Sequence, residues 1–305
     1  MGKVVLTGAG GFLGSHLLVE LVGRGTEVCA VSSKSTAQLL SSAGSEGADL
    51  SLLKVIGHDD WNGLAAEISD ADVLVNCAFP RNVDGYQLAE GMGYLQKLFA
   101  AAGSSQVGAV VNISSQSVYS QKRTEPACED TPVCLESKYA VAKYASEQLL
   151  EAYFADRPHT NIRLASLIGP GFDQRVVNKM TRCAMESGLI EVCDNGSRFG
   201  YLDVLDAANA LAAVCESDPT VWEHVYNLGP EDGVTLTEIA DCVMKEVAAR
   251  CGRQVKLQMA CSDSGATTSV LDSSLFVRSF NWEAHNSLSG TVKRIVDFAN
   301  KGVFE

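Results

Sequence analysis

Three glycines near the start of the chain stand between a short apolar segment and an amphipathic one. Gly8, Gly11 and Gly14 are spaced three residues apart, directly after Thr7. Because glycine has no Cβ, such a loop can turn tightly and let its backbone approach a pyrophosphate. The helix expected after the loop would offer its free N–H groups to the same anion. This order of strand, glycine loop and helix predicts a dinucleotide-binding unit.

The segments that follow continue this alternation of strand and helix patterns. Short apolar runs predict strands at residues 4–7, 27–31, 52–56, 73–76, 109–114 and 161–166. Helical periodicity predicts helices at residues 12–24, 36–42, 61–68, 86–102 and 137–154. Strands that alternate with helices form βαβ units. We therefore expect an α/β fold with a Rossmann-type, doubly wound parallel sheet.

The alternation of strand and helix patterns becomes irregular after Gly169-Pro170-Gly171. Helices are predicted at residues 176–187, 204–216, 236–250 and 288–300, with few strand-like runs between them. We expect a dinucleotide-binding domain over residues 1–170 and a smaller, mostly helical substrate-binding lobe over residues 171–305.

The composition of the chain argues against several classes of binding partner. The formal net charge of −13 disfavours nucleic acid and anionic membrane surfaces, and no apolar run approaches the roughly 20 residues that span a bilayer. The ten cysteines show no C-x-x-C spacing, so no metal site is expected. The first residues read as a strand and not as a leader. We expect a cytoplasmic protein with reduced thiols.

A candidate catalytic pair lies in the predicted helix at residues 137–154. Tyr139 and Lys143 have the Y-x-x-x-K spacing, which places both side chains on one helix face. A free tyrosine has a pKa of about 10, and a nearby lysine cation favours the phenolate form that a base needs near neutrality. Ser115, at the end of the fifth predicted strand, can steady a substrate oxygen. The pattern predicts proton transfer coupled to hydride transfer.

These motifs together resemble the extended branch of the short-chain dehydrogenase/reductase family, the epimerase/dehydratase group. The matching segments are T-G-A-G-G-F-L-G-S-H at residues 7–16, S-S-x-x-V-Y at 114–119 and the Y-x-x-x-K pair. The resemblance implies a small-molecule substrate between two lobes, and a homodimer formed by two helices per subunit. It also implies that segment 198–228 returns to the first domain, with V-Y-N-L-G at 225–229 as a later turn.

The resemblance also assigns cofactor contacts. They are Gly8, Gly11, Phe12, Leu13, Gly14, Cys77, Ala78 and Lys143, the last through the nicotinamide ribose. At the end of the second strand, NAD-dependent relatives usually carry an acid, whereas this chain has Ser32, Ser33 and Lys34. Hydroxyls and an ammonium suit a 2′-phosphate, which favours NADP over NAD. Asp59 or Asp60 matches the family's adenine-contacting acid, and a surface role is the alternative for both.

For the substrate, the resemblance points to six residues: Ser115, Gln116, Ser117, Arg175, Asn178 and Arg198. Gln116 and Ser117 replace the Asp-Glu pair of the 4,6-dehydratases, which disfavours dehydration. Ser117 and Arg175 replace the cysteine and histidine of the epimerase-reductases that make GDP-fucose, which disfavours that pathway too.

The arginines that hold the diphosphate in UDP-galactose 4-epimerases correspond here to Phe199 and Cys261. Arg175 and Arg198 lie nearby in the alignment and can substitute, because a guanidinium binds phosphate oxygens bidentately. A surface ion pair is the alternative for each. Glu90 stands where the family usually has an asparagine, and the sequence offers no reason for it.

The leading functional hypothesis is redox chemistry at a sugar carbon, by a nucleotide-sugar 4-epimerase or ketoreductase. The missing arginines and the NADP-like residues favour a second hypothesis, a reductase of a smaller or more apolar ketone. The third is a catalytically silent protein that senses NADP. Retention of both Tyr139 and Lys143 argues against it.

Overall fold

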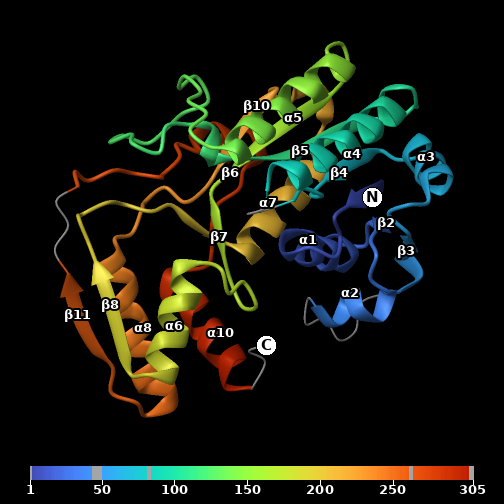
Figure 1. Cartoon of the computed structure of the whole chain (residues 1–305). Helices are drawn as coiled ribbons and strands as arrows, with labels where there is room; N and C mark the ends of the chain where they lie inside the picture. Colours follow the sequence, from blue (N-terminus) through green and yellow to red (C-terminus); the bar gives the residue numbers. More distant parts are fainter. Residues whose placement is uncertain (1, 43–49, 81–83, 261–263, 302–305) are drawn as a thin grey trace.

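A computed structural model describes residues 2–42, 50–80, 84–260 and 264–301 (Figure 1). Its centre is a seven-stranded sheet in the order β10-β6-β5-β4-β1-β2-β3. All neighbouring strands pair in parallel. The strands are β1 (Lys3–Thr7), β2 (Glu27–Val31), β3 (Leu53–Ile56), β4 (Val73–Asn76), β5 (Ala109–Ser115), β6 (His159–Leu164) and β10 (Val225–Leu228). The expected Rossmann-type parallel sheet is confirmed.

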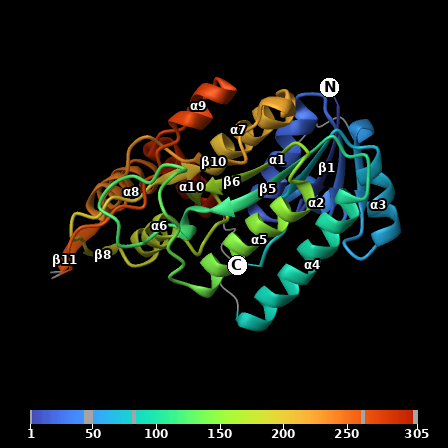
Figure 2. The same ribbon diagram turned by 90° about the horizontal axis from the view of Figure 1, so that it is seen from above.

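Helices cover both faces of this sheet (Figure 2). They are α1 (Phe12–Gly23), α2 (Thr36–Ser42), α3 (Trp61–Ser69), α4 (Gly85–Gly103), α5 (Lys138–Phe154) and α7 (Val204–Glu216). Alternate residues of a strand point to opposite faces. Accordingly, Val4 and Leu6 of β1 join one apolar cluster with α1 and α7. Val5 joins another cluster with α3, α4 and α5. The sheet is buried on both sides, as its apolar strands predicted.

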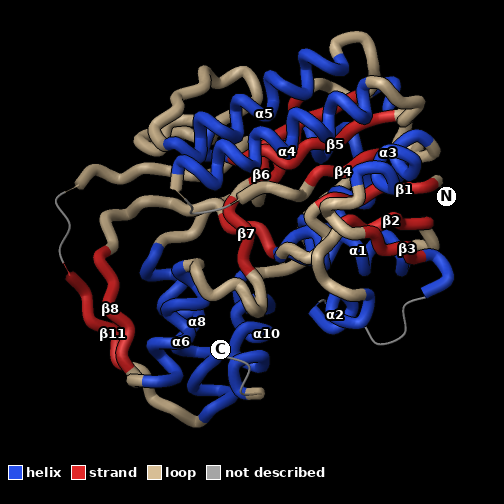
Figure 3. Tube along the Cα trace, turned by 45° about the vertical axis from the view of Figure 1, so that its right-hand side comes forward, coloured by secondary structure: helices blue, strands red, loops and turns tan. Residues whose placement is uncertain are grey.

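The second half of the chain adds a smaller lobe with its own apolar core (Figure 3). It contains α6 (Val176–Glu186), β8 (Leu189–Cys193), α8 (Leu236–Cys251), β11 (Lys256–Ala260) and α10 (Leu288–Asn300). β8 and β11 pair in parallel, and a short parallel pair joins β7 (Ser166–Ile168) to β9 (Tyr201–Asp203). The sequence did not predict these four strands, because each is short and β11 is largely exposed.

Besides α7, the second half supplies a strand of the central sheet and a helix that packs against it. β10, which was expected to form a turn, is the seventh strand and pairs with β6. Helix α9 (Ser274–Phe280) packs against β10 and α7, and its Phe276 joins the core beneath α1 and α7. The division into domains at residue 170 stays a prediction.

A ladder of polar side chains crosses four strands inside the sheet. Thr7 Oγ1 donates to Asn76 Oδ1 over 2.8 Å, and Asn76 Nδ2 donates to Asn112 Oδ1 over 2.9 Å. Asn112 Nδ2 donates in turn to Asn161 Oδ1 over 2.9 Å. Each of these residues stands opposite the next in the strand register. All four are buried, and each finds its partner on the neighbouring strand.

In the described part of the chain, nine cysteines are free. No helix among the described residues is both long enough and apolar enough to cross a membrane.

Candidate active site

The glycine loop joins β1 to α1 at the carboxyl edge of the sheet. Gly8 has a φ of +71°, and a Cβ there would lie 2.6 Å from Ala78 N. A Cβ on Gly14 would lie 2.2 Å from Gly8 O. Both positions therefore exclude a side chain, and the loop folds closely over the start of α1. The start of a helix has N–H groups without partners inside the helix, and such groups suit a pyrophosphate.

Two cavities open beside this loop. The serine cavity, of about 350 Å³, is named for Ser32 and Ser33 in its wall. The tyrosine cavity, of about 330 Å³, contains Tyr139. Both are lined by Gly11 and Phe79, so the two cavities adjoin at these residues.

The serine cavity brings together the residues expected to set the preference between NADP and NAD. Ser32, Ser33, Lys34 and Ala78 all line it. Ser32 Oγ accepts a hydrogen bond of 3.0 Å from Lys34 N, which holds the two residues in one turn. Among the described residues that line this cavity, none carries a carboxylate.

The two acids expected near the adenine lie outside the wall of the serine cavity. Asp60 caps α3, where its Oδ1 accepts from Gly63 N over 2.9 Å. Asp59 is exposed. The residue of this turn that lines the cavity is His58, which the sequence analysis missed. A contact of either acid with adenine stays a prediction.

The expected catalytic residues Ser115, Tyr139 and Lys143 all line the tyrosine cavity. Lys143 is buried, and its Nζ donates to Ile113 O over 2.7 Å. The same Nζ lies 4.0 Å from the ring centroid of Phe79 and 5.9 Å from that of Tyr139. The ammonium is therefore held on the cavity wall between the end of β5 and the tyrosine.

Contacts on both sides of Tyr139 and Lys143 hold helix α5 in place. Ser137 caps it by accepting from Ala140 N over 3.0 Å, which places Tyr139 in the first turn. One turn beyond Lys143, the buried Glu147 accepts from Arg163 of β6 over 2.8 Å and from the hydroxyl of Ser114. These contacts tie the helix to the ends of β5 and β6.

The residues after β5 form a short turn in the cavity wall. Ser115 Oγ accepts from Ser117 N over 3.2 Å and from Ser117 Oγ over 3.0 Å. Gln116 Oε1 accepts from Arg123 Nη2 over 3.1 Å. As expected, Ser115, Gln116 and Ser117 all line the tyrosine cavity. Because Ser117 satisfies an acceptor site of Ser115, the Ser115 hydroxyl hydrogen can turn toward a substrate oxygen.

Arg175 lines the same cavity from the lobe side, at the start of α6. Its guanidinium carbon lies 5.1 Å from the ring centroid of Phe172. Its Nε is buried and has no hydrogen-bond partner among the described residues. Burial lowers the pKa of Arg175 from its usual value. A desolvated cation with an unused donor can bind an anion strongly.

The other two expected substrate residues do not line the cavity. Arg198 is exposed, and its Nη2 donates to Gly233 O over 2.5 Å. Asn178 is buried, and its Nδ2 donates to Gly169 O over 2.9 Å, which supports the loop before α6. Phe199 packs on Tyr201 with a centroid distance of 5.9 Å, and Cys261 lies outside the described residues.

Several lining residues were missed because they are apolar and carry no chemical motif. Phe79 lines both cavities, and Phe172 stacks on Phe12 with a centroid distance of 4.2 Å. Phe79 follows the carboxyl end of β4, and ligands of open α/β sheets bind at that edge. Its position was therefore the one available signal. Phe12, Leu13 and Cys77, expected at the cofactor, also line the tyrosine cavity.

Comparison with known proteins agrees with this geometry. The chain is 30% identical to a dTDP-4-dehydrorhamnose reductase of Mycobacterium tuberculosis over 81% of its own length and 76% of that protein. It is 23% identical to the protein CapI of Staphylococcus aureus, over 97% and 98% of the two chains. A UDP-glucuronic acid 4-epimerase from Bacillus cereus, solved with UDP-glucuronic acid and NAD, superposes with a TM-score of 0.81 at 20% identity, over 98% and 99% of the chains.

The match to a family covers most of the chain, including the glycine loop, Ser115, Tyr139, Lys143 and β10. It extends over residues 4–229. This confirms the expected enzyme class, the extended short-chain dehydrogenases/reductases. The chain belongs to the NAD dependent epimerase/dehydratase family.

Proposed function

We propose that this chain reduces a keto group on the sugar of a nucleotide sugar, with NADPH as the hydride donor and Tyr139 as the general acid. The observation that carries the proposal is the wall of the tyrosine cavity. It combines Tyr139 and Ser115 with two cationic side chains, Lys143 and Arg175. None of the described residues in that wall is an acid, although the whole chain has a net charge of −13.

The residues of the tyrosine cavity divide the work of a ketone reduction. The bound nicotinamide supplies the hydride. Ser115 donates a hydrogen bond to the carbonyl oxygen, and Tyr139 delivers the proton that this oxygen takes up. The charge of Lys143 stabilises the phenolate that Tyr139 leaves behind. General acid catalysis of this kind contributes typically 10²–10⁴-fold to the rate.

Arg175 supports the choice of a nucleotide sugar. A diphosphate buried in the cavity needs a cationic partner, because an unpaired buried charge is very costly. Arg175 offers an Nε without a partner among the described residues, at the side of the cavity next to the smaller lobe. Arg198 is already bonded to Gly233 O and lies outside the wall. We therefore assign the diphosphate contact to Arg175.

The serine cavity supports NADP over NAD. Ser32, Ser33 and Lys34 line it without a carboxylate among the described lining residues. A 2′-phosphate gains hydrogen bonds from hydroxyls and an ammonium, whereas an acid would repel it. An NADP-dependent enzyme that exchanges its cofactor fits a reductase better than an epimerase.

One observation favours a second candidate, a nucleotide-sugar 4-epimerase. The solved structures that superpose on nearly the whole chain include 4-epimerases with bound NAD. Tightly held NAD in the purified protein would point to this second function, and an empty, NADP-preferring site would point to the first. A homodimer is proposed for both on the family resemblance alone.

The test is a calorimetric titration of the cofactor-loaded protein with each of four nucleotides: UDP, GDP, CDP and dTDP. We expect one of them to bind. Arg175→Ala should weaken that binding roughly tenfold to a hundredfold, because hydrogen bonds to charged groups contribute about 1.5–3 kcal/mol. Arg198→Ala is the matched control and should change it less than twofold. If Arg198→Ala weakens binding as much, the assignment to Arg175 alone is wrong. If none of the four binds at millimolar concentration, the smaller-ketone reductase replaces this proposal.

A further inference from the structure

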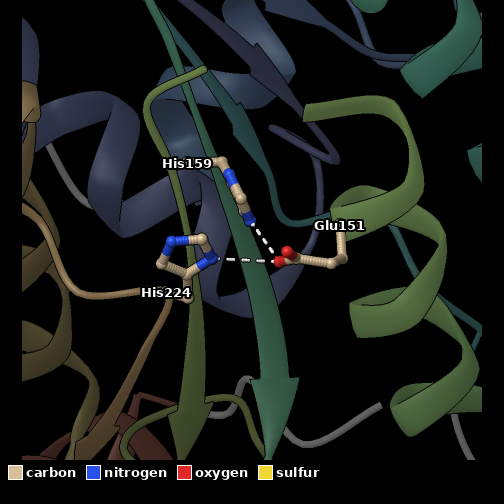
Figure 4. A group of neighbouring side chains, drawn as sticks. All are labelled: Glu151, His159 and His224. Carbon is tan, nitrogen blue, oxygen red and sulfur yellow. Dashed lines mark hydrogen bonds and ion pairs between the residues drawn. The ribbon is translucent and has the colours of Figure 1, made fainter. Parts of the chain in front are cut away.

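Two histidines and a glutamate meet at the amino edge of the central sheet, opposite the edge that carries the two cavities (Figure 4). His159 is the first residue of β6, and His224 directly precedes β10. Because these strands are parallel neighbours, their first residues lie at the same edge. Glu151 reaches the pair from α5. β6 has six residues, so about 17 Å separate this cluster from the catalytic end of the strand.

The cluster is compact. Glu151 Oε2 lies 2.8 Å from His159 Nε2 and 3.0 Å from His224 Nδ1. The two imidazole centroids are 4.6 Å apart. Figure 4 shows both rings directing a nitrogen at the same carboxylate oxygen. Three potential ligand atoms therefore converge within 4.8 Å of one another.

The buried ring of His159 has more acceptors than a neutral imidazole can satisfy. Its Nδ1 lies 2.9 Å from Arg157 O, and its Nε2 faces the Glu151 carboxylate. The His159 side chain is only 1% exposed. A neutral imidazole carries one N–H, so it can donate to one of these oxygens and not to both. If Nδ1 donates to Arg157 O, the lone pair of Nε2 is directed into the cluster.

This arrangement is the one that a metal-binding histidine uses. Such a histidine donates its second ring N–H to a backbone carbonyl or carboxylate, which fixes the tautomer and directs the other nitrogen at the metal. Zn²⁺ binds imidazole nitrogens and carboxylate oxygens at about 2.0–2.2 Å, and takes two histidines and a glutamate in tetrahedral sites that keep one position open. In such a site the ligand atoms stand about 3.3 Å apart. The two distances to Glu151 Oε2, 2.8 and 3.0 Å, require a small outward movement, and the two histidine nitrogens lie within 4.8 Å of each other.

We propose that Glu151, His159 and His224 form a Zn²⁺ site, with the fourth position open to water on the side of the exposed His224. The ion would cross-link α5, β6 and the segment that enters β10. Since α5 also carries Tyr139 and Lys143, the cross-link would brace the helix that holds the catalytic pair. The site is separate from the proposed cofactor and substrate cavities and does not depend on the proposed function.

The test begins with the full chain after dialysis against a chelator. Titration with ZnCl₂, followed by calorimetry, should give one ion per chain with a dissociation constant in the micromolar range or below. Added Zn²⁺ should raise the Tm, because a ligand that binds only the folded state stabilises it by mass action. CoCl₂ serves as a second probe, whose absorption spectrum reports nitrogen coordination.

Glu151→Gln and His224→Ala should each weaken Zn²⁺ binding at least tenfold and remove the Tm increase. Both positions are partly exposed, so these variants should fold, and their NADP(H) binding should equal that of the wild type. The matched control His285→Ala removes another exposed histidine and should bind Zn²⁺ as the wild type does. No binding at 100-fold excess of Zn²⁺ over protein overturns the proposal. Equal binding by His224→Ala and wild type overturns it too, since the ion would then sit elsewhere.

Discussion

The tyrosine cavity and the serine cavity share Gly11 and Phe79 but differ in how the chain builds them. The serine cavity is lined largely by residues that follow β1, β2, β3 and β4. The tyrosine cavity adds residues from the ends of β5 and β6, from α5 and from the start of α6. The proposed contacts with the 2′-phosphate side of the cofactor therefore come from the repeating βα turns of the sheet. The proposed chemistry needs side chains from segments that lie far apart in the sequence.

If the tyrosine cavity performs the chemistry, Tyr139→Phe should lower turnover at least a hundredfold, because it removes the proton donor. Its dissociation constant for NADP(H) should stay within about twofold of the wild-type value. Activity assays and fluorescence titration on the same preparation measure both. Tyr153→Phe, in the exposed part of the same helix, is the matched control. A Tyr139→Phe enzyme that keeps more than a tenth of the activity contradicts the division of roles.

The next largest effect concerns the loop between the cavities. A Cβ at Gly14 would lie 2.2 Å from Gly8 O, so Gly14→Ala should displace the loop. We expect at least tenfold weaker cofactor binding, and a loss of about 1–3 kcal/mol in the free energy of unfolding, the usual cost of overpacking. Gly23→Ala in the same helix meets no atom within 4 Å and should be neutral or slightly stabilising. Denaturant unfolding and cofactor titration would show whether the two variants differ as expected.

A smaller effect is expected from Ser32→Asp in the serine cavity. The new carboxylate opposes a 2′-phosphate and can accept from ribose hydroxyls. We expect roughly tenfold weaker NADP binding, tighter NAD binding and little change in turnover at saturating cofactor. Ser35→Asp adds the same charge at an exposed position outside the cavity wall and should leave the preference unchanged. A wild-type protein that already prefers NAD tenfold would refute the proposed role of Ser32.

The smallest effect concerns Cys77, which lines the tyrosine cavity but not the serine cavity. Burial raises the pKa of its thiol to about 12. Because the thiolate is the nucleophile, alkylation of Cys77 at pH 8 should be slow, and its rate should rise about tenfold per pH unit up to pH 10. The exposed Cys128 is the internal control. Mass spectrometry of iodoacetamide-treated protein would detect rapid labelling of Cys77, which would contradict the raised pKa of its thiol.

The two cavities also differ in how far the sequence could predict them. Gly8, Gly11 and Ser32 belong to short local patterns. The glycines follow from the tight turn that the loop makes, and the serine from the need to avoid a negative charge beside a 2′-phosphate. Tyr139 and Lys143 are four residues apart on one helix, so their joint position was equally predictable. Arg175 and Arg198 were equivalent candidates in the alignment. The structure separates them, because Arg175 packs against Phe172 in the wall of the tyrosine cavity, whereas Arg198 donates to Gly233 O outside it.

Five strands of the sheet, β1 to β5, were predicted to within one residue at each end, because apolar runs mark them. β6 was predicted two residues too late. The pairs β8–β11 and β7–β9 were missed for the opposite reason. These strands are short. In β8 buried apolar residues alternate with exposed ones, and in β11 most residues are exposed. β10 was taken for a turn because four residues before a glycine carry too little pattern. Its pairing with β6 is a long-range contact that no local sequence signal encodes.

The polar ladder from Thr7 through Asn76 and Asn112 to Asn161 distinguishes the correct strand register from its competitors. Apolar strands such as β4 and β5 would bury nearly the same surface if they slipped past each other by one residue. Side chains alternate between faces, however, so such a slip would turn Asn112 away from both Asn76 and Asn161. Each buried amide left unpaired costs roughly 1–3 kcal/mol. Hydrophobic burial alone would leave several strand registers close in energy, and the ladder selects one of them. In that register the carboxyl ends of β1, β4, β5 and β6 lie at matching heights under the two cavities.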